Sequence, residues 1–215
     1  MKIEVFSDFT CPFCYIGKRE LERAGPDTPK VNAPSFYEGM AKKYDISLEA
    51  AKDMTKGIAV RAAEIGLHYD FDKMTTAHTE KAHRLAKWTQ QFGKAAAYTE
   101  ALMAGYFTAG EDVNEDAFLL KVIAQLDLDI EEAKVILATN DFSEALDRDR
   151  YDAQQLGVQS VPFFVFENRY GIKGAEPNEV FVRTLHQAAA LAGNQPTIKL
   201  VGNDGAACND DVCKL

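Results

Sequence analysis

The fold of this chain is decided by one stretch, Ser7-Asp8-Phe9-Thr10-Cys11-Pro12-Phe13-Cys14-Tyr15. It follows an apolar segment, residues 2–6, that predicts a short strand, and it opens a segment that predicts a helix with Lys18 and Arg19 in water. Cysteines three residues apart lie one turn apart on one helical face, so their sulfurs can meet as a dithiol or a disulfide. Pro12 suits the first turn of a helix, because its missing N–H would have no partner there. The strand-then-helix context therefore predicts a redox-active CxxC pair.

The two cysteines are expected to play different parts. Cys11 would lie beside the free N–H groups and the positive dipole end of the helix, which stabilise a thiolate, so we expect it to have a lowered pKa and to attack. Cys14 would lie deeper and resolve the mixed disulfide. Half of a zinc site would need two further ligands, and a structural disulfide is less expected in a chain without a secretory signal.

The composition narrows the class of protein and of partner. The 215 residues are enough for one sizeable core, or for one core with an inserted subdomain. The net charge of -9 argues against nucleic acid and against an anionic membrane surface as partners. No apolar run is long enough to cross a bilayer and no export signal is visible, so we expect a cytoplasmic location. The acidic surface and the length fit a monomer or a weak dimer.

The rest of the chain divides into a loop, a long helical part and a second strand-containing part. Residues 25–34 hold three prolines and predict the loop. Residues 35–156 read as helical throughout, with N-terminal caps predicted at Ser47, Thr76, Asn114, Asp129 and Asp141. The last elements are two strands that form a hairpin, a helix and a segment that can pair locally: residues 163–166, 170–173, 178–192 and 197–201.

A strand-helix unit, a helical insertion and a strand-hairpin-helix unit together predict a thioredoxin-like pattern. The expected fold class is α/β, rich in helix, with a thioredoxin-like fold that carries a large all-helical insertion. Residues 1–33 and 157–193 would form the thioredoxin-like domain and residues 34–156 the insertion subdomain. Residues 194–215 would form a polar C-terminal tail that carries a second cysteine pair.

Two motifs resemble the DsbA-like oxidoreductases of the FrnE type. The first is the opening stretch continued through Ile16-Gly17-Lys18-Arg19; the second is Gly157-Val158, then Ser160-Val161-Pro162-Phe163-Phe164-Val165-Phe166, with Gly174-Ala175 after it. Segments 35–38 and 83–86 are similar too, so the resemblance covers most of residues 1–192. It implies that Pro162 is a cis-proline facing the redox pair, although X–Pro bonds are cis in only about 5–6% of cases. It also implies that the backbone of Val161 pairs with an extended substrate peptide, and we expect Phe13 to contact substrate as well.

The sequence departs from this family after the first helix, where members carry a second strand. Ala24 runs almost directly into the proline-rich loop, which would leave the edge of the first strand exposed. Either the fold tolerates this loss, or residues are absent from the sequence between about Ala24 and Pro26. We favour the second interpretation.

Two residues near the cysteines bear on the chemistry. The exported DsbA enzymes have a histidine between their cysteines, and its positive charge helps to hold the thiolate. Phe13 cannot do so, and we therefore expect a less acidic Cys11 and a less oxidising disulfide, closer to those of a reductase or an isomerase. Asp8 either relays protons, opposes the thiolate, or is simply a polar residue at a strand end.

The tail holds the only other cysteines, Cys208 and Cys213, five residues apart. A loop of that size closes easily, so the pair is read as a redox shuttle, as a structural clip or as metal ligands. We expect Asp210 and Asp211 to raise the pKa of nearby thiols by repulsion, which argues against a fast nucleophile there. The histidines, His68, His78, His83 and His186, show no zinc spacing, and no metal site is predicted.

The function that these patterns favour is a thiol-disulfide oxidoreductase that is also suited to disulfide isomerisation. Its partners would be protein thiols and disulfides or small thiols, with glutathione as a redox partner and no resident cofactor. A second reading comes from the kappa-type glutathione transferases and 2-hydroxychromene-2-carboxylate isomerases, which share the scaffold but carry a serine where Cys11 stands. A third is a zinc-holding or chaperone-like binding protein.

Overall fold

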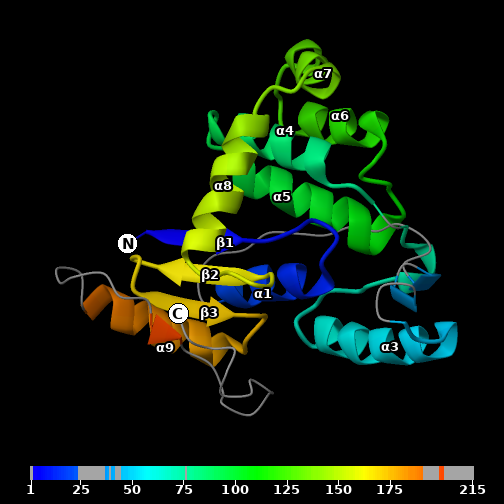
Figure 1. The fold of residues 1–215 in the computed structure, drawn as a ribbon. Helices are drawn as coiled ribbons and strands as arrows, with labels where there is room; N and C mark the ends of the chain where they lie inside the picture. The colour runs from blue at the N-terminus through cyan, green and yellow to red at the C-terminus, as the bar shows by residue number, and fades with distance from the viewer. Residues whose placement is uncertain are drawn as a thin grey trace.

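The computed structural model of the chain describes residues 2–23, 37–38, 40–41, 45–75, 77–190 and 199–200. The predictions about the Cys208–Cys213 pair, the proline-rich loop and the strand expected after Ala24 lie outside the described residues. Figure 1 shows the described elements gathered around a small sheet, with most of the helices stacked on one side of it.

The sheet has four strands in the order β1-β2-β3-β4: Ile3–Phe6, Phe163–Phe166, Tyr170–Lys173 and Lys199–Leu200. β1 and β3 both run antiparallel to β2, whereas β4 runs parallel to β3. The β2–β3 hairpin turns through Glu167 and Asn168, whose φ angles are 52° and 51°. Two successive positive φ angles match the right-handed twist of the strands, which is why such turns join tight hairpins. The first three strands and the hairpin confirm the sequence prediction.

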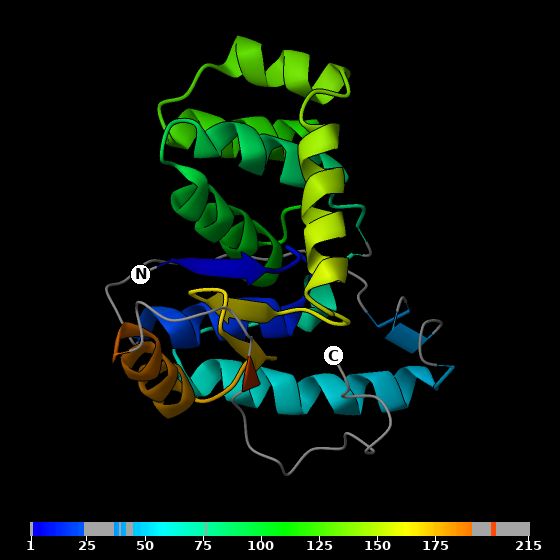
Figure 2. The same ribbon diagram turned by 60° about the vertical axis from the view of Figure 1, so that its left-hand side comes forward.

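Two helices pack on the sheet and a third lies beside them. α1 (Pro12–Arg23) contacts α9 (Asn178–Ala190), and α9 packs on β2 and β3. This side of the sheet buries an aromatic and aliphatic cluster: Phe164, Phe166, Tyr170, Ile172, Val180, Phe181 and Ala188. α3 (Leu48–Glu64) runs along the far side of α1, as Figure 2 shows.

The other helices form a group that stands on the opposite side of the sheet. They are α4 (Glu80–Gln90), α5 (Ala95–Ala104), which continues as a π-helix over Gly105–Ala109, α6 (Asp116–Gln125), α7 (Ile130–Ala138) and α8 (Ser143–Gln155), with a 3-10 turn over Phe71–Lys73 before them. In Figure 1, α4 to α7 lie above the sheet and α8 returns from them toward β2. The helical character predicted for this part of the chain is confirmed over these ranges.

Two of the predicted helix caps are confirmed. The Ser47 hydroxyl accepts a hydrogen bond from the Ala50 N–H at 3.1 Å and begins α3. The Asp129 carboxylate accepts the N–H groups of Glu131 and Glu132 at 2.7 and 3.1 Å and begins α7. Each cap satisfies backbone donors that have no partner inside the helix.

Two other predicted caps are wrong, and the cap predicted at Thr76 lies outside the described residues. α6 begins after Glu115, because the Asn114 side chain instead accepts the His78 N–H at 2.9 Å. α8 begins after Phe142, which takes a left-handed φ of 68°. Short polar side chains have several backbone donors within reach, so their presence alone does not decide which residue caps a helix.

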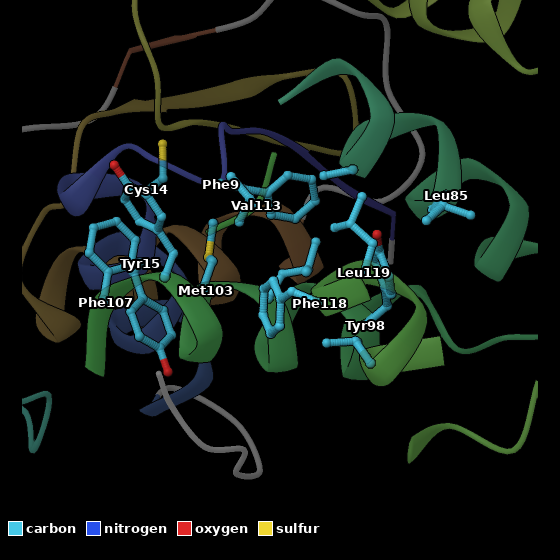
Figure 3. Close-up of a cluster of buried hydrophobic side chains, with 14 of the residues drawn as sticks. Phe9, Cys14, Tyr15, Leu85, Tyr98, Met103, Phe107, Val113, Phe118 and Leu119 are labelled. Atoms are coloured by element: carbon cyan, nitrogen blue, oxygen red, sulfur yellow. The ribbon is translucent and has the colours of Figure 1, made fainter. Parts of the chain in front are cut away.

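The expectation that Lys18 and Arg19 lie in water is also wrong. Their side chains are only 15% and 12% exposed, and both contact the carboxylate of Glu100 on α5. The sequence pattern of α1 predicts an amphipathic helix. It does not predict that other helices cover the polar face of α1. The buried residues around this contact form a large cluster; in Figure 3, Cys14 and Tyr15 lie at one end of it beside Phe107.

Candidate active site

Both cysteines lie at the N-terminus of α1 but in different surroundings. Cys11 precedes the first helical residue and is half-buried, and its thiol is 3.7 Å from the carbonyl oxygen of Val161. Cys14 lies one turn later and is 1% exposed. The Cys14 N–H donates to the Cys11 carbonyl at 2.9 Å, which starts the helix between the two sulfurs. The Cys11 sulfur is therefore accessible to a partner, whereas the Cys14 sulfur is buried.

The pKa values of the two thiols move in opposite directions. A hydrogen bond from the Cys14 thiol lowers the pKa of Cys11; burial opposes this decrease, and the N–H groups of Cys14 and Phe13 support it. Burial raises the pKa of Cys14 strongly, and its interaction with the Cys11 sulfur adds to the increase. Free N–H groups at the helix start, which the sequence argument invoked, thus contribute less than the neighbouring sulfur. The arrangement suits a Cys11 thiolate held by a neutral Cys14.

Pro162 lies against the same helix. The Val161–Pro162 peptide bond is cis, as the family resemblance implied, and the Pro162 carbonyl accepts the Gly174 N–H at 2.8 Å. α1 approaches this turn closely, because a Cβ built on Gly17 would lie 3.1 Å from Pro162 Cγ. The side chains of Val161 and Phe13 are each 39% exposed, so both predicted substrate contacts are open to a partner.

Tyr69 is a site residue that the sequence did not indicate. It lies in the connector after α3, and its hydroxyl donates to the Pro12 carbonyl at 2.8 Å, between the two cysteines. Its ring stacks with those of Phe107 and Tyr15, at centroid distances of 4.7 and 6.1 Å. The contact fixes the first turn of α1 from outside the helix. Because its partner is 57 residues away and is a backbone atom, no local pattern points to it.

Glu100 is the second such residue. Its carboxylate is 4% exposed and receives Lys18 Nζ at 2.5 Å, Arg19 at 2.9 Å and the Tyr15 hydroxyl at 2.8 Å. Burial, followed by the nearby Glu100 charge, raises the pKa of Tyr15, so this hydroxyl stays protonated and donates. A buried charge needs such partners, and the network fastens α1 to α5.

Asp8 and His83 complete the surroundings of the sulfurs. The Asp8 N–H donates to Cys14 Sγ at 3.4 Å, and the Asp8 carboxylate lies 3.2 Å from His83 Nε2 on α4. From the sequence, Asp8 was considered by itself, and His83 as part of a segment similar to the family and among histidines without zinc spacing. Burial works to raise the pKa of Asp8, but hydrogen bonds with His83, Thr79 and Thr10 outweigh it and hold that pKa below its usual value.

A cavity of about 650 Å³ opens beside these residues. It extends from Val161 and the preceding residues 158–160 past Asp8 and His83 to one face of α8, which contributes Leu146 and Arg150. Its wall is partly apolar and partly charged. Val161, whose carbonyl contacts the Cys11 thiol, lines one end of this cavity.

The described part of the chain shows neither a cluster of metal ligands nor a membrane-spanning helix. Within it, no three His, Cys, Asp or Glu side chains gather as metal ligands would. No helix in the described ranges is long and apolar enough to span a membrane.

Comparisons with known proteins identify the family and the fold of the chain. A family model described as a DSBA-like thioredoxin domain matches residues 2–186. The crystal structure of the probable DsbA oxidoreductase SCO1869 from Streptomyces coelicolor is similar with a TM-score of 0.80 and 30% sequence identity, over 99% of this chain and 98% of that one. The curated protein YwbO of Bacillus subtilis (strain 168), itself uncharacterized, is 22% identical over 193 residues, which is 85% of this chain and 94% of YwbO.

A further solved structure is similar in fold alone. The 2-hydroxychromene-2-carboxylate isomerase matches with a TM-score of 0.67 at 17% identity, over 89% of this chain and 96% of its own. The α/β, helix-rich fold predicted from the sequence is thereby confirmed, whereas the FrnE type and the domain boundaries stay predictions. With a family model that spans residues 2–186, this chain belongs to the DsbA-like thioredoxin domain family.

Proposed function

We propose that this chain is a thiol-disulfide oxidoreductase that acts on protein thiols and disulfides through Cys11 and Cys14. The observation that carries the proposal is the asymmetry of the pair: the pKa of half-buried Cys11 is lowered, whereas that of buried Cys14 is raised. A nucleophile and a resolving thiol need this difference, because only the thiolate attacks and only the accessible sulfur can meet a substrate first.

The reaction consists of two exchanges. The Cys11 thiolate attacks one sulfur of a substrate disulfide; a bond forms between them, the substrate S–S bond breaks, and the other substrate sulfur leaves as a thiolate that takes up a proton. Cys14 then loses its proton and attacks the Cys11 sulfur, which closes the Cys11–Cys14 disulfide and releases the second substrate thiol. The substrate gains two electrons and the cysteine pair loses them. Run backwards, the same steps oxidise a dithiol, and stopping after the first step permits isomerisation.

Substrate contact is assigned to the exposed residues around Cys11. An extended peptide can pair with the Val161 backbone, contact the Phe13 ring and extend into the adjoining cavity. The two sulfurs carry both electrons, so the proposed reaction needs no resident cofactor. Glutathione would act as a second substrate, and the reduced glutathione of a cytoplasm, the location expected from the sequence, would return the pair to the dithiol.

The test is disulfide exchange with a fluorogenic peptide disulfide under reducing glutathione. We expect the Cys11→Ser variant to fall to the buffer rate, and the Cys14→Ser variant to accumulate a mixed disulfide between Cys11 and the peptide, visible by mass spectrometry. The matched control is the Cys208→Ser/Cys213→Ser variant, which keeps the catalytic pair. Exchange that persists in Cys11→Ser would remove the basis of the proposal.

A redox titration assigns the second cysteine pair in the same protein. Alkylation and mass spectrometry at each glutathione ratio read Cys11–Cys14 and Cys208–Cys213 separately. The Cys208–Cys213 pair is the shuttle that the sequence suggested if it titrates near the potential of Cys11–Cys14 and if its removal slows turnover. A tail pair that stays oxidised throughout is a structural clip.

A further inference from the structure

The contact between Asp8 and His83 joins the redox stretch to the helical group. Asp8 lies in the turn between β1 and Cys11, and its carboxylate accepts the Thr10 hydroxyl at 3.0 Å and lies 3.2 Å from His83 Nε2. The His83 ring packs on Phe9, with the ring centroids 4.5 Å apart. Both polar side chains are partly exposed to the cavity. The imidazole is thus held in place between Phe9 and the Asp8 carboxylate.

The same aspartate reaches the sulfurs. Its N–H contacts Cys14 Sγ at 3.4 Å, which places the residue within a hydrogen bond of the pair. The hydrogen bond from Cys14 lowers the pKa of Cys11, and the Asp8 charge opposes that decrease. The Asp8 carboxylate acts on both sulfurs through its charge, which is the smallest of the influences on the pKa of Cys11, and a nearby negative charge disfavours a thiolate.

His83 is placed to weaken the effect of that charge, because its Nε2 atom lies 3.2 Å from the Asp8 carboxylate. The other charged groups around it come from its own helix and from α8: Glu80, Lys87, Asp149 and Arg150. Lys87 is paired with Asp149 at 2.5 Å, so these two charges largely cancel. Among the described residues, Asp8 is the anion in contact with the imidazole.

We propose that Asp8 and His83 are positioning residues that set the charge beside the redox pair. The Asp8 charge opposes a thiolate on Cys11, and the contact with the His83 imidazole at 3.2 Å weakens that opposition. The reactivity of Cys11 is thereby linked to a histidine that stands 72 positions later in the chain. This inference rests on the proposed role of Cys11 as the attacking sulfur.

The experiment measures the alkylation rate of Cys11 in the reduced full-length protein between about pH 5 and 9, with peptide-resolved mass spectrometry to exclude the other thiols. We expect Asp8→Asn to speed alkylation at pH 6 by at least about threefold, because the opposing charge is gone. We expect His83→Gln, which keeps a neutral hydrogen-bond donor, to slow it by a similar factor. The double variant should behave like Asp8→Asn alone, because His83 acts through Asp8.

The controls separate charge from structure. Asp149→Asn removes a carboxylate from the same cavity that is paired with Lys87 rather than with His83, and should change the rate by less than about 1.5-fold. At pH 9 all variants should react alike if access to Cys11 is unchanged. A purely structural role would move Asp8→Asn and His83→Gln in the same direction, and that result would overturn the proposal.

The two experiments distinguish a wrong role for Asp8 and His83 from a wrong proposed function. Alkylation reports the ionisation of Cys11 without any substrate, whereas peptide exchange reports the reaction. If Cys11→Ser abolishes exchange but the two single variants alkylate like the wild type, only the role of Asp8 and His83 is lost. If the wild type shows no exchange at all, the oxidoreductase assignment falls whatever the alkylation rates are.

Discussion

Replacing Glu100 by glutamine should destabilise the protein by about 3 kcal/mol. The carboxylate is 4% exposed and faces Lys18 and Arg19, which are only 15% and 12% exposed. Removing one partner of a buried ion pair costs about 3–5 kcal/mol, because the remaining charge has lost its water without keeping its counter-charge. Glutamine keeps an oxygen that can still accept the Tyr15 hydroxyl, so we expect the lower end of that range. For a chain of 215 residues this corresponds to a melting temperature lower by about 6–12 °C.

Urea unfolding followed by far-ultraviolet circular dichroism measures this change, with thermal melts in parallel. The matched control is Glu111→Gln, because Glu111 pairs with Lys121 at the surface and the loss of such a pair costs at most about 1 kcal/mol. Equal destabilisation by the two variants would show that the Glu100 network does not hold α1 against α5.

Four further substitutions test contacts of α1 and its surroundings, one of them as a control on α3. Gly17→Ala places a Cβ 3.0 Å from the nearest ring atom and should cost about 1–3 kcal/mol in urea unfolding, whereas Gly57→Ala, with nothing within 4 Å, should stabilise α3 by about 0.5–1 kcal/mol. Tyr69→Phe keeps the stacked ring but removes the donor to the Pro12 carbonyl, and should cost about 1 kcal/mol in the same assay. Because the pKa of Asp8 is held below its usual value, its charge stabilises the fold above about pH 4, and this contribution is lost as the pH falls. The urea midpoint of Asp8→Asn should accordingly fall less than that of the wild type between about pH 6 and 2.

The parts of the fold that the sequence predicts are those with a local cause. The strand before Cys11, the helix that begins at Pro12 and the β2–β3 hairpin each follow from periodicity or turn chemistry within about ten residues. Ser47 and Asp129 were placed correctly as caps because their partners lie two or three residues away. The cis bond before Pro162 had no such local cause, and only the family resemblance indicated it.

The parts that the sequence does not predict depend on contacts across the fold. The prediction that Asn114 caps a helix was wrong. Its side chain instead accepts a backbone N–H from a residue 36 positions away, and this hydrogen bond competes with capping. The sequence predicts that Lys18 and Arg19 are exposed, because nothing in the sequence of α1 indicates that α5 will cover them. Asp8 stands three residues before Cys11 in the sequence, but its contact with His83 could not be predicted. The sequence pattern places His83 on a helix and says nothing about its partner. Local patterns fix elements, and packing decides which polar side chains become partners.

The helical segment between α1 and β2 is part of the candidate active site rather than an attachment to it. It supplies a hydroxyl to the first turn of α1, a carboxylate to the second and an imidazole to the turn before Cys11, from Tyr69, Glu100 and His83. The pKa of a thiol depends on fixed charges and donors of this kind. Substitutions in that segment, more than 50 residues from the sulfurs, can therefore change their reactivity while the CxxC motif stays the same. In the proposed reaction, Phe13 between the cysteines would therefore be one influence on the redox potential of the pair, and the helical segment would be another.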